Sequence, residues 1–158
     1  MSLIGKKAPY FKLRSHNNEP VMLSQLKGEP VVLLFFPFAF SGVCTQEMCN
    51  IRDNFNVYNN LKAKVLGISV DSHYALKAWA ETMGIGFDLL SDFNKDVSAA
   101  YNCLMEVFVP GVYDYRVVSK RSAFVINRNG DVIYEEILED ARLEPSYDKI
   151  VEILKSLE

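Results

Sequence analysis

The feature that most constrains this sequence is an apolar run at residues 31–36 that leads directly into the stretch 37–49. The run is apolar at consecutive positions, which is typical of a central strand covered on both faces. The stretch that follows contains a Pro/Ser/Gly turn and predicts a helix that starts at or near Cys44. At a helix start a cysteine meets unpaired N–H groups and the positive end of the dipole, which favour its thiolate form. The sequence therefore predicts a nucleophilic sulfur at Cys44.

A second cysteine follows on the same predicted helix. Cys49 lies ~140° around the helical wheel from Cys44, beside Asp53, Asn56 and Asn60, and so on the polar face. This position favours a redox role over a role as a small core residue. Residues five apart in an intact helix have Cα atoms roughly 8–9 Å apart, whereas a disulfide needs about 4.4–6.8 Å. Either the two cysteines never bond, or the helix unwinds locally when they do.

The remaining pattern alternates between strand-like and helix-like segments. Strands are expected at residues 10–14, 21–23, 65–70, 87–90, 121–126 and 132–137, and helices at 42–62, 74–83 and 95–101, with a last helix opened by Pro145. Residues 103–120 are rich in aromatic and β-branched side chains and have no clear assignment. Alternating elements of this kind predict an α/β fold with a central sheet flanked by helices.

Composition narrows the class of protein further. A chain of 158 residues with 49% apolar residues is expected to form one domain, residues 1–158. A net charge of −3 with scattered Lys and Arg predicts no nucleic-acid partner, and no membrane span or targeting segment is visible. Three cysteines without an export signal favour reactive thiols in a cytoplasmic enzyme over a disulfide framework. No spacing typical of a metal, flavin or nicotinamide site is present, so no cofactor is expected.

One segment resembles a known active-site motif. Pro37-x3-Ser41-x2-Cys44 is similar to the Pro-x3-Thr/Ser-x2-Cys motif of peroxiredoxins, and Cys49 resembles the resolving cysteine of the bacterioferritin-comigratory-protein/PrxQ branch. The similarity extends through residues 69–72, 89–92 and 121–124 to nearly the whole chain. It implies a thioredoxin-like fold with a mixed sheet and an N-terminal β-hairpin.

The resemblance also implies a reaction and a set of roles. Cys44 would attack a peroxide, Cys49 would convert the resulting sulfenic acid to a disulfide, and a thioredoxin- or glutaredoxin-like dithiol would reduce it. Helix unwinding would then accompany each cycle. The other residues implied are Arg121 and Ser41 as donors, Pro37 as a shield of the sulfur, Glu47 in the first helical turn as a support for the arginine, and Phe38, Phe40 and Val43 around the substrate pocket.

Other interpretations remain open at this point. Cys49 is a bystander if an external thiol resolves Cys44, and the chain is a non-enzymatic redox sensor or holdase if Cys44 reacts slowly. A disulfide oxidoreductase is disfavoured because Cys-x4-Cys replaces the Cys-x-x-Cys of that class. Arg116 is a weaker candidate than Arg121. Cys103 is expected to be an incidental thiol, and His16 and His73 to be surface residues. The choice between monomer and homodimer is left open.

Overall fold

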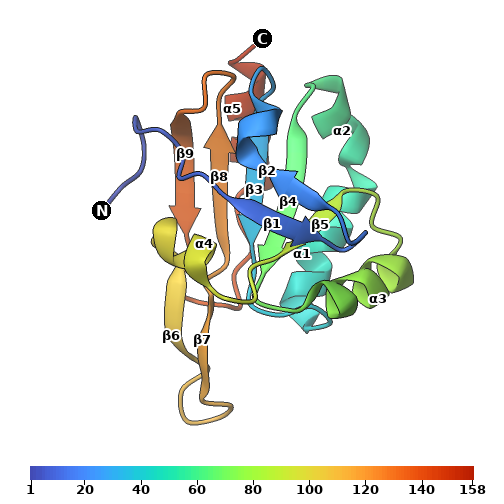
Figure 1. Ribbon diagram of the computed structural model, residues 1–158, viewed down its shortest axis with the longest axis vertical. Helices are drawn as coiled ribbons and strands as arrows, with labels where there is room; N and C mark the ends of the chain where they lie inside the picture. The colour runs from blue at the N-terminus through green and yellow to red at the C-terminus, as the bar shows by residue number, and fades with distance from the viewer.

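A seven-stranded mixed sheet forms the centre of the computed structural model, which describes residues 1–158. The strand order is β2-β1-β5-β4-β3-β8-β9, with β3, β4 and β5 parallel and the remaining pairs antiparallel. The strands are β1 (Lys12–Ser15), β2 (Pro20–Met22), β3 (Val31–Phe35), β4 (Lys64–Ser69), β5 (Asp88–Ser91), β6 (Leu104–Phe108), β7 (Tyr115–Ser119), β8 (Ser122–Ile126) and β9 (Val132–Ile137). The predicted thioredoxin-like fold with a mixed sheet and an N-terminal hairpin is confirmed (Figure 1).

The central strand β3 explains how the two faces of the sheet are covered. All five of its residues are buried, as the apolar run predicted. Val32 and Leu34 point into a core shared with α1, α3 and α5, whereas Leu33 and Phe35 point into a second core on the opposite face with α4. The helices are α1 (Gly42–Asp53), α2 (Phe55–Asn60), α3 (His73–Met83), α4 (Asp96–Ala100) and α5 (Tyr147–Lys155), and a short 3-10 helix, η1, spans Leu23–Leu26.

The helix predicted over residues 42–62 is interrupted. Asn54 leaves the helical conformation (φ −111°, ψ 17°), and its side-chain Nδ2 donates to the carbonyl of Asn50 at 2.8 Å. A side chain that hydrogen-bonds the preceding turn competes with the backbone ladder, so α1 ends and α2 begins as a separate piece. The helix that carries Cys44 and Cys49 is therefore a unit of 12 residues.

Local signals explain the ends of the other elements. Ser72 caps α3 by accepting a hydrogen bond from the Ala75 N–H, and Gly84 ends the helix in the left-handed region with φ 66°. In the β8–β9 hairpin, the Asn127 side chain accepts from the backbone N–H groups of Asn129 and Asp131, which closes the turn. The end of α3 agrees with the predicted helix 74–83, and the turn lies between the predicted strands 121–126 and 132–137.

Two parts of the chain differ from expectation. The unassigned stretch 103–120 forms an antiparallel pair, β6 and β7, that projects beyond the sheet at the end where β3 stops (Figure 1). His16 is buried rather than on the surface, because its Nδ1 accepts the N–H of Leu89 at 3.1 Å. None of the helices is long and apolar enough to cross a bilayer.

Candidate active site

The loop that follows β3 places the helix that carries Cys44. Pro37 is buried, and Phe40 adopts a left-handed conformation with φ 68°, which turns the chain toward α1. Ser41 is the residue before the helix, and its hydroxyl donates to the carbonyl of Phe38 at 3.0 Å. This hydrogen bond links the two ends of the turn. This short loop connects the buried strand to the first turn of α1.

Cys44 lies in the first turn of α1 and is completely buried. The helix begins at Gly42, in agreement with the predicted range 42–62. The guanidinium of Arg121 approaches the sulfur with both terminal nitrogens, Nη1 and Nη2, each 3.3 Å from Sγ. Arg121 precedes strand β8, which pairs with β3, so the sheet brings together two residues that are 77 positions apart.

Two further contacts fix the guanidinium. Glu47 Oε1 accepts from Arg121 Nη1 at 2.7 Å, and the carbonyl of Ala141 accepts from Nη2 at 3.0 Å. Glu47 is fully buried, so this ion pair is shielded from solvent. The expectation that Glu47 lies in the first helical turn is wrong, because a helix that starts at Gly42 has Glu47 in its second turn. It is held in place by the buried arginine rather than by the end of the helix dipole.

Burial and charge have opposite effects on the Cys44 sulfur. Burial raises the pKa of the Cys44 thiol, because a thiolate buried among protein atoms loses its contact with solvent. The charge of Arg121 is the strongest influence that lowers this pKa, and the Ser41 hydroxyl and the Phe38 backbone act in the same direction. Burial is the larger influence, so the acidic thiol expected from the helix start is not found in this closed arrangement. The sequence shows where a helix starts but not how deeply a sulfur is covered.

A single guanidinium charge faces two groups that can become anionic. Burial raises the pKa of Glu47 to about 7, although Arg121 acts to lower it. Glu47 Oε2 and Arg121 Nε are also buried without a protein partner. Proton binding at Cys44 and at Glu47 is therefore coupled through the arginine that both groups contact.

Cys49 lies on the same helix as Cys44 but outside the buried stripe. Its side chain is half-buried, and the predicted neighbours Asp53, Asn56 and Asn60 are exposed. Both cysteines are free thiols, and α1 is continuous from Gly42 to Asp53. The structure therefore places Cys49 within one and a half turns of Cys44.

The three residues predicted around a substrate pocket differ in their surroundings and exposure. The Phe38 ring packs edge-on against Phe108 and Tyr115, with ring centres 5.2 and 5.8 Å apart. The Phe40 side chain is 56% exposed, and its ring centre lies 6.3 Å from that of Trp79. Val43 is half-buried. The left-handed turn at Phe40 sends this side chain outward, which residue order alone does not reveal.

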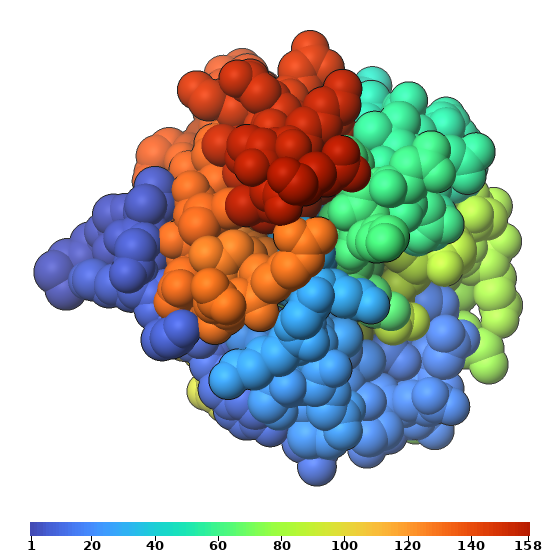
Figure 2. All heavy atoms as spheres, turned by 90° about the horizontal axis from the view of Figure 1, so that it is seen from above, coloured from blue at the N-terminus to red at the C-terminus, as the bar shows by residue number.

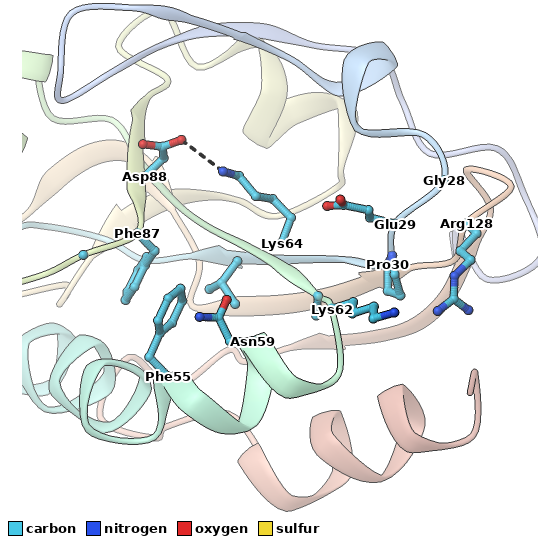
Figure 3. Close-up of a pocket in the computed structure, with 13 residues that line it drawn as sticks. Gly28, Glu29, Pro30, Phe55, Asn59, Lys62, Lys64, Phe87, Asp88 and Arg128 are labelled. Carbon is cyan, nitrogen blue, oxygen red and sulfur yellow. Dashed lines mark ion pairs between the residues drawn. The ribbon is translucent and has the colours of Figure 1, made fainter.

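A separate cleft lies at the opposite edge of the sheet from Cys44. It has a volume of about 610 Å³ and is bordered by the segments that lead into β3, β4 and β5 (Figure 3). Those are the amino ends of the parallel strands, whereas Cys44 follows the carboxyl end of β3. Figure 2 shows the molecule from this edge, with the C-terminal helix in red. Within the cleft, the ammonium of Lys64 and the carboxylate of Asp88 lie 3.5 Å apart and form an ion pair. Because the cleft lies at the opposite ends of the strands, it is separate from the cysteine site.

The remaining candidates lie apart from the Cys44 sulfur. Arg116 is exposed on β7 and has no contact with Cys44. Cys103 is buried, and burial raises the pKa of its thiol to about 12. Sequence reasoning missed the Ala141 carbonyl, because a backbone group in a loop leaves no signal in residue identity. It also missed Asp71, whose carboxylate accepts from the Ala39 N–H at 2.8 Å.

Fold and site together define a peroxiredoxin, a class of thiol-dependent peroxidases. The chain belongs to the AhpC/TSA family, whose model matches residues 4–135. It is 36% identical over 138 residues to alkyl hydroperoxide reductase E of Mycobacterium tuberculosis, covering 85% of this chain and 84% of that protein. It is 31% identical over 157 residues to the chloroplastic peroxiredoxin Q of Sedum lineare, covering 97% and 78%.

A solved structure agrees with these sequence relatives. The peroxidoxin BcpB of Mycobacterium tuberculosis superposes with a TM-score of 0.86 at 28% identity, over 100% of this chain and 99% of that one. These similarities place the chain in the PrxQ/bacterioferritin-comigratory-protein branch. The chain is thus an oxidoreductase of the peroxidase type, as its motif predicted.

Proposed function

We propose that this enzyme reduces hydrogen peroxide and organic hydroperoxides, with Cys44 as the nucleophile. The Cys44 thiolate attacks one peroxide oxygen, and the O–O bond breaks. The sulfur becomes a sulfenic acid, and the other oxygen takes a proton and leaves as water or an alcohol. The name of the mycobacterial relative, an alkyl hydroperoxide reductase, supports the inclusion of organic substrates.

The observation that carries this proposal is the paired contact of Arg121 with Cys44. Two N–H groups of one guanidinium, each 3.3 Å from Sγ, favour the thiolate and stabilise the charge that develops on the breaking O–O bond. Glu47 and the Ala141 carbonyl hold that guanidinium so that it needs little rearrangement during the reaction. The N–H groups of the first helical turn are the other donors proposed for the peroxide, together with the Ser41 hydroxyl once it turns away from the Phe38 carbonyl. Buried Pro37 limits access of water.

Cys49 is proposed to resolve the sulfenic acid. Its thiolate attacks the Cys44 sulfur, water leaves, and a disulfide forms between residues 44 and 49. An external dithiol of the thioredoxin or glutaredoxin type then reduces this bond by exchange. Both cysteines lie in the intact helix α1, where positions five apart are roughly 8–9 Å apart at Cα. The first turns of α1 must therefore unwind before the disulfide can form.

Replacing single cysteines tests these roles. With a thioredoxin-type reductant, Cys44→Ser should abolish turnover, and Cys49→Ser should consume one equivalent of peroxide and then stall. Cys103→Ser is the matched control and should turn over like the natural protein, because its thiol lies outside the site. Full turnover by Cys44→Ser would refute the peroxidase mechanism.

A one-cysteine peroxidase is the second candidate. The intact helix and the two free thiols favour it, because they require no rearrangement. Unchanged steady-state turnover by Cys49→Ser would establish this alternative in place of resolution by Cys49. A rate of Cys44 oxidation no greater than that of free cysteine would instead indicate a redox sensor or holdase.

A further inference from the structure

The loop between β3 and α1 needs support from outside itself. Phe40 has a φ of 68°, a conformation that bulky residues rarely adopt without external contacts. The same loop carries the Phe38 backbone and the Ser41 hydroxyl, both of which act to lower the pKa of Cys44. A small movement of this loop therefore changes the surroundings of the sulfur. The contacts that hold the loop are part of what makes Cys44 reactive.

Asp71 supplies such a contact. Its Oδ2 accepts the N–H of Ala39, the residue before Phe40, at 2.8 Å, and the hydroxyl of Ser69 at 2.7 Å. The hydroxyl of Ser91 donates to the Asp71 carbonyl at 2.6 Å. Asp71 thus joins the loop after β3 to the carboxyl ends of β4 and β5. Ser69 fixes the carboxylate, Ser91 fixes the Asp71 backbone, and the carboxylate in turn holds the Ala39 amide of the loop.

We propose that Asp71 is a positioning residue for the reaction at Cys44, an inference that rests on the proposed function. It acts through the Ala39 amide and has no contact with Cys44 or Arg121. Both hydrogen bonds to its side chain are accepted by Oδ2. The loop therefore requires an acceptor oxygen at this position rather than a negative charge. An amide oxygen in the same place, as in Asp71→Asn, accepts the same two donors.

The N-terminus of α3 is capped by the residue next to Asp71, so Asp71 is not needed for that role. Ser72, not Asp71, caps α3, with its hydroxyl 3.2 Å from the Ala75 N–H. Ser72→Ala is therefore a matched control that weakens the adjacent helix without releasing the loop. An effect of Asp71 that is absent from this control concerns the loop rather than general stability.

The test compares Asp71→Ala, Asp71→Asn and Ser72→Ala. Two quantities are measured, namely the rate of Cys44 oxidation by stoichiometric hydrogen peroxide and the pH profile of Cys44 alkylation. We expect Asp71→Ala to slow oxidation by roughly 10-fold or more, since losing a hydrogen bond to a charged group costs about one power of ten. Its alkylation profile should move to higher pH, because Ser41 and Phe38 no longer lower the pKa of Cys44. Asp71→Asn should stay within about 3-fold of the natural protein, and Ser72→Ala should be unchanged in both.

The outcomes separate this inference from the proposed function. If the natural protein reacts rapidly and Asp71→Ala matches it in rate and pH profile, the inference is wrong. Asp71→Asn as slow as Asp71→Ala also refutes the acceptor role. If Asp71→Ala does not fold, Asp71→Glu keeps the charge but displaces the oxygen by one methylene, and a natural rate in that variant overturns the inference. A natural protein that reacts only like free cysteine refutes the proposed function itself.

Discussion

If Cys44 and Cys49 must meet by unwinding of α1, then weakening this helix should accelerate disulfide formation. Gln46 lies between the two cysteines, is exposed, and its side chain makes no hydrogen bond. Gln46→Gly and Gln46→Ala therefore change helix propensity with little effect on packing. Glycine is about 1 kcal/mol less favourable than alanine within a helix, which corresponds to a roughly 5-fold difference in the population of the unwound form.

The two steps can be separated by the fluorescence of the single tryptophan. Trp79 is fully buried in the same core as Cys44, and its ring centre lies 5.2 Å from that of Phe36. In a stopped-flow experiment, sulfenic acid formation should depend on peroxide concentration, and the later resolving step should not. We expect the resolving step to be about 5-fold faster in Gln46→Gly than in Gln46→Ala, with equal rates for the first step.

A matched pair in another helix controls for general destabilisation. Lys77 is exposed in the middle of α3 and forms no ion pair, so Lys77→Gly and Lys77→Ala carry the same propensity difference away from the cysteines. This pair should differ in unfolding free energy but not in the resolving rate. Equal resolving rates in the two Gln46 variants, or an equal response at Lys77, would contradict a local unwinding of α1.

Three other predictions concern the charges and the thiols. Arg121→Lys offers one donor in place of the paired contact and should slow Cys44 oxidation roughly 10- to 100-fold in stopped-flow, whereas a natural rate would argue against the pair. Burial raises the pKa of Glu47 from 4.5 to about 7, so its protonated form contributes stability that is fully present below about pH 4.5 and lost as the pH rises through about 7. The free energy of unfolding in urea should therefore fall by about 3 kcal/mol more in the natural protein than in Glu47→Gln between these pH values. Parallel plots of unfolding free energy against pH would refute the raised pKa. Because burial raises the pKa of Cys103 to about 12, a thiol reagent at pH 8 should label it only after unfolding, and rapid labelling of the native protein would show that it is accessible.

Much of the fold was predictable because its strongest signals are local. The buried β3, the hairpin turn at Asn127 and the end of α3 at Gly84 each follow from residue types within a few positions. The break at Asn54 was missed because the apolar pattern continues across it, while one side-chain hydrogen bond decides the backbone path. His16 was misplaced for a related reason, since its partner is a backbone group 73 residues away.

The candidate site was predictable in its members more than in its geometry. The motif and the strand that starts after Arg121 indicated the residues that meet, and the structure brings Cys44, Arg121 and Glu47 together. The outward turn of Phe40 and the depth of the Cys44 sulfur depend on the three-dimensional path of the chain, so the exposure of this ring and the raised pKa of this thiol were not predicted. Burial is a property of the folded chain and cannot be read from neighbours in sequence.

The most direct test of the account is the second-order rate of Cys44 oxidation by hydrogen peroxide at neutral pH. It should be followed by Trp79 fluorescence and assigned to Cys44 by peptide mass spectrometry. Paired donors at the sulfur predict a rate at least roughly 100-fold above that of free cysteine at the same pH. A rate equal to that of free cysteine, or oxidation at Cys49 or Cys103 before Cys44, would contradict the account.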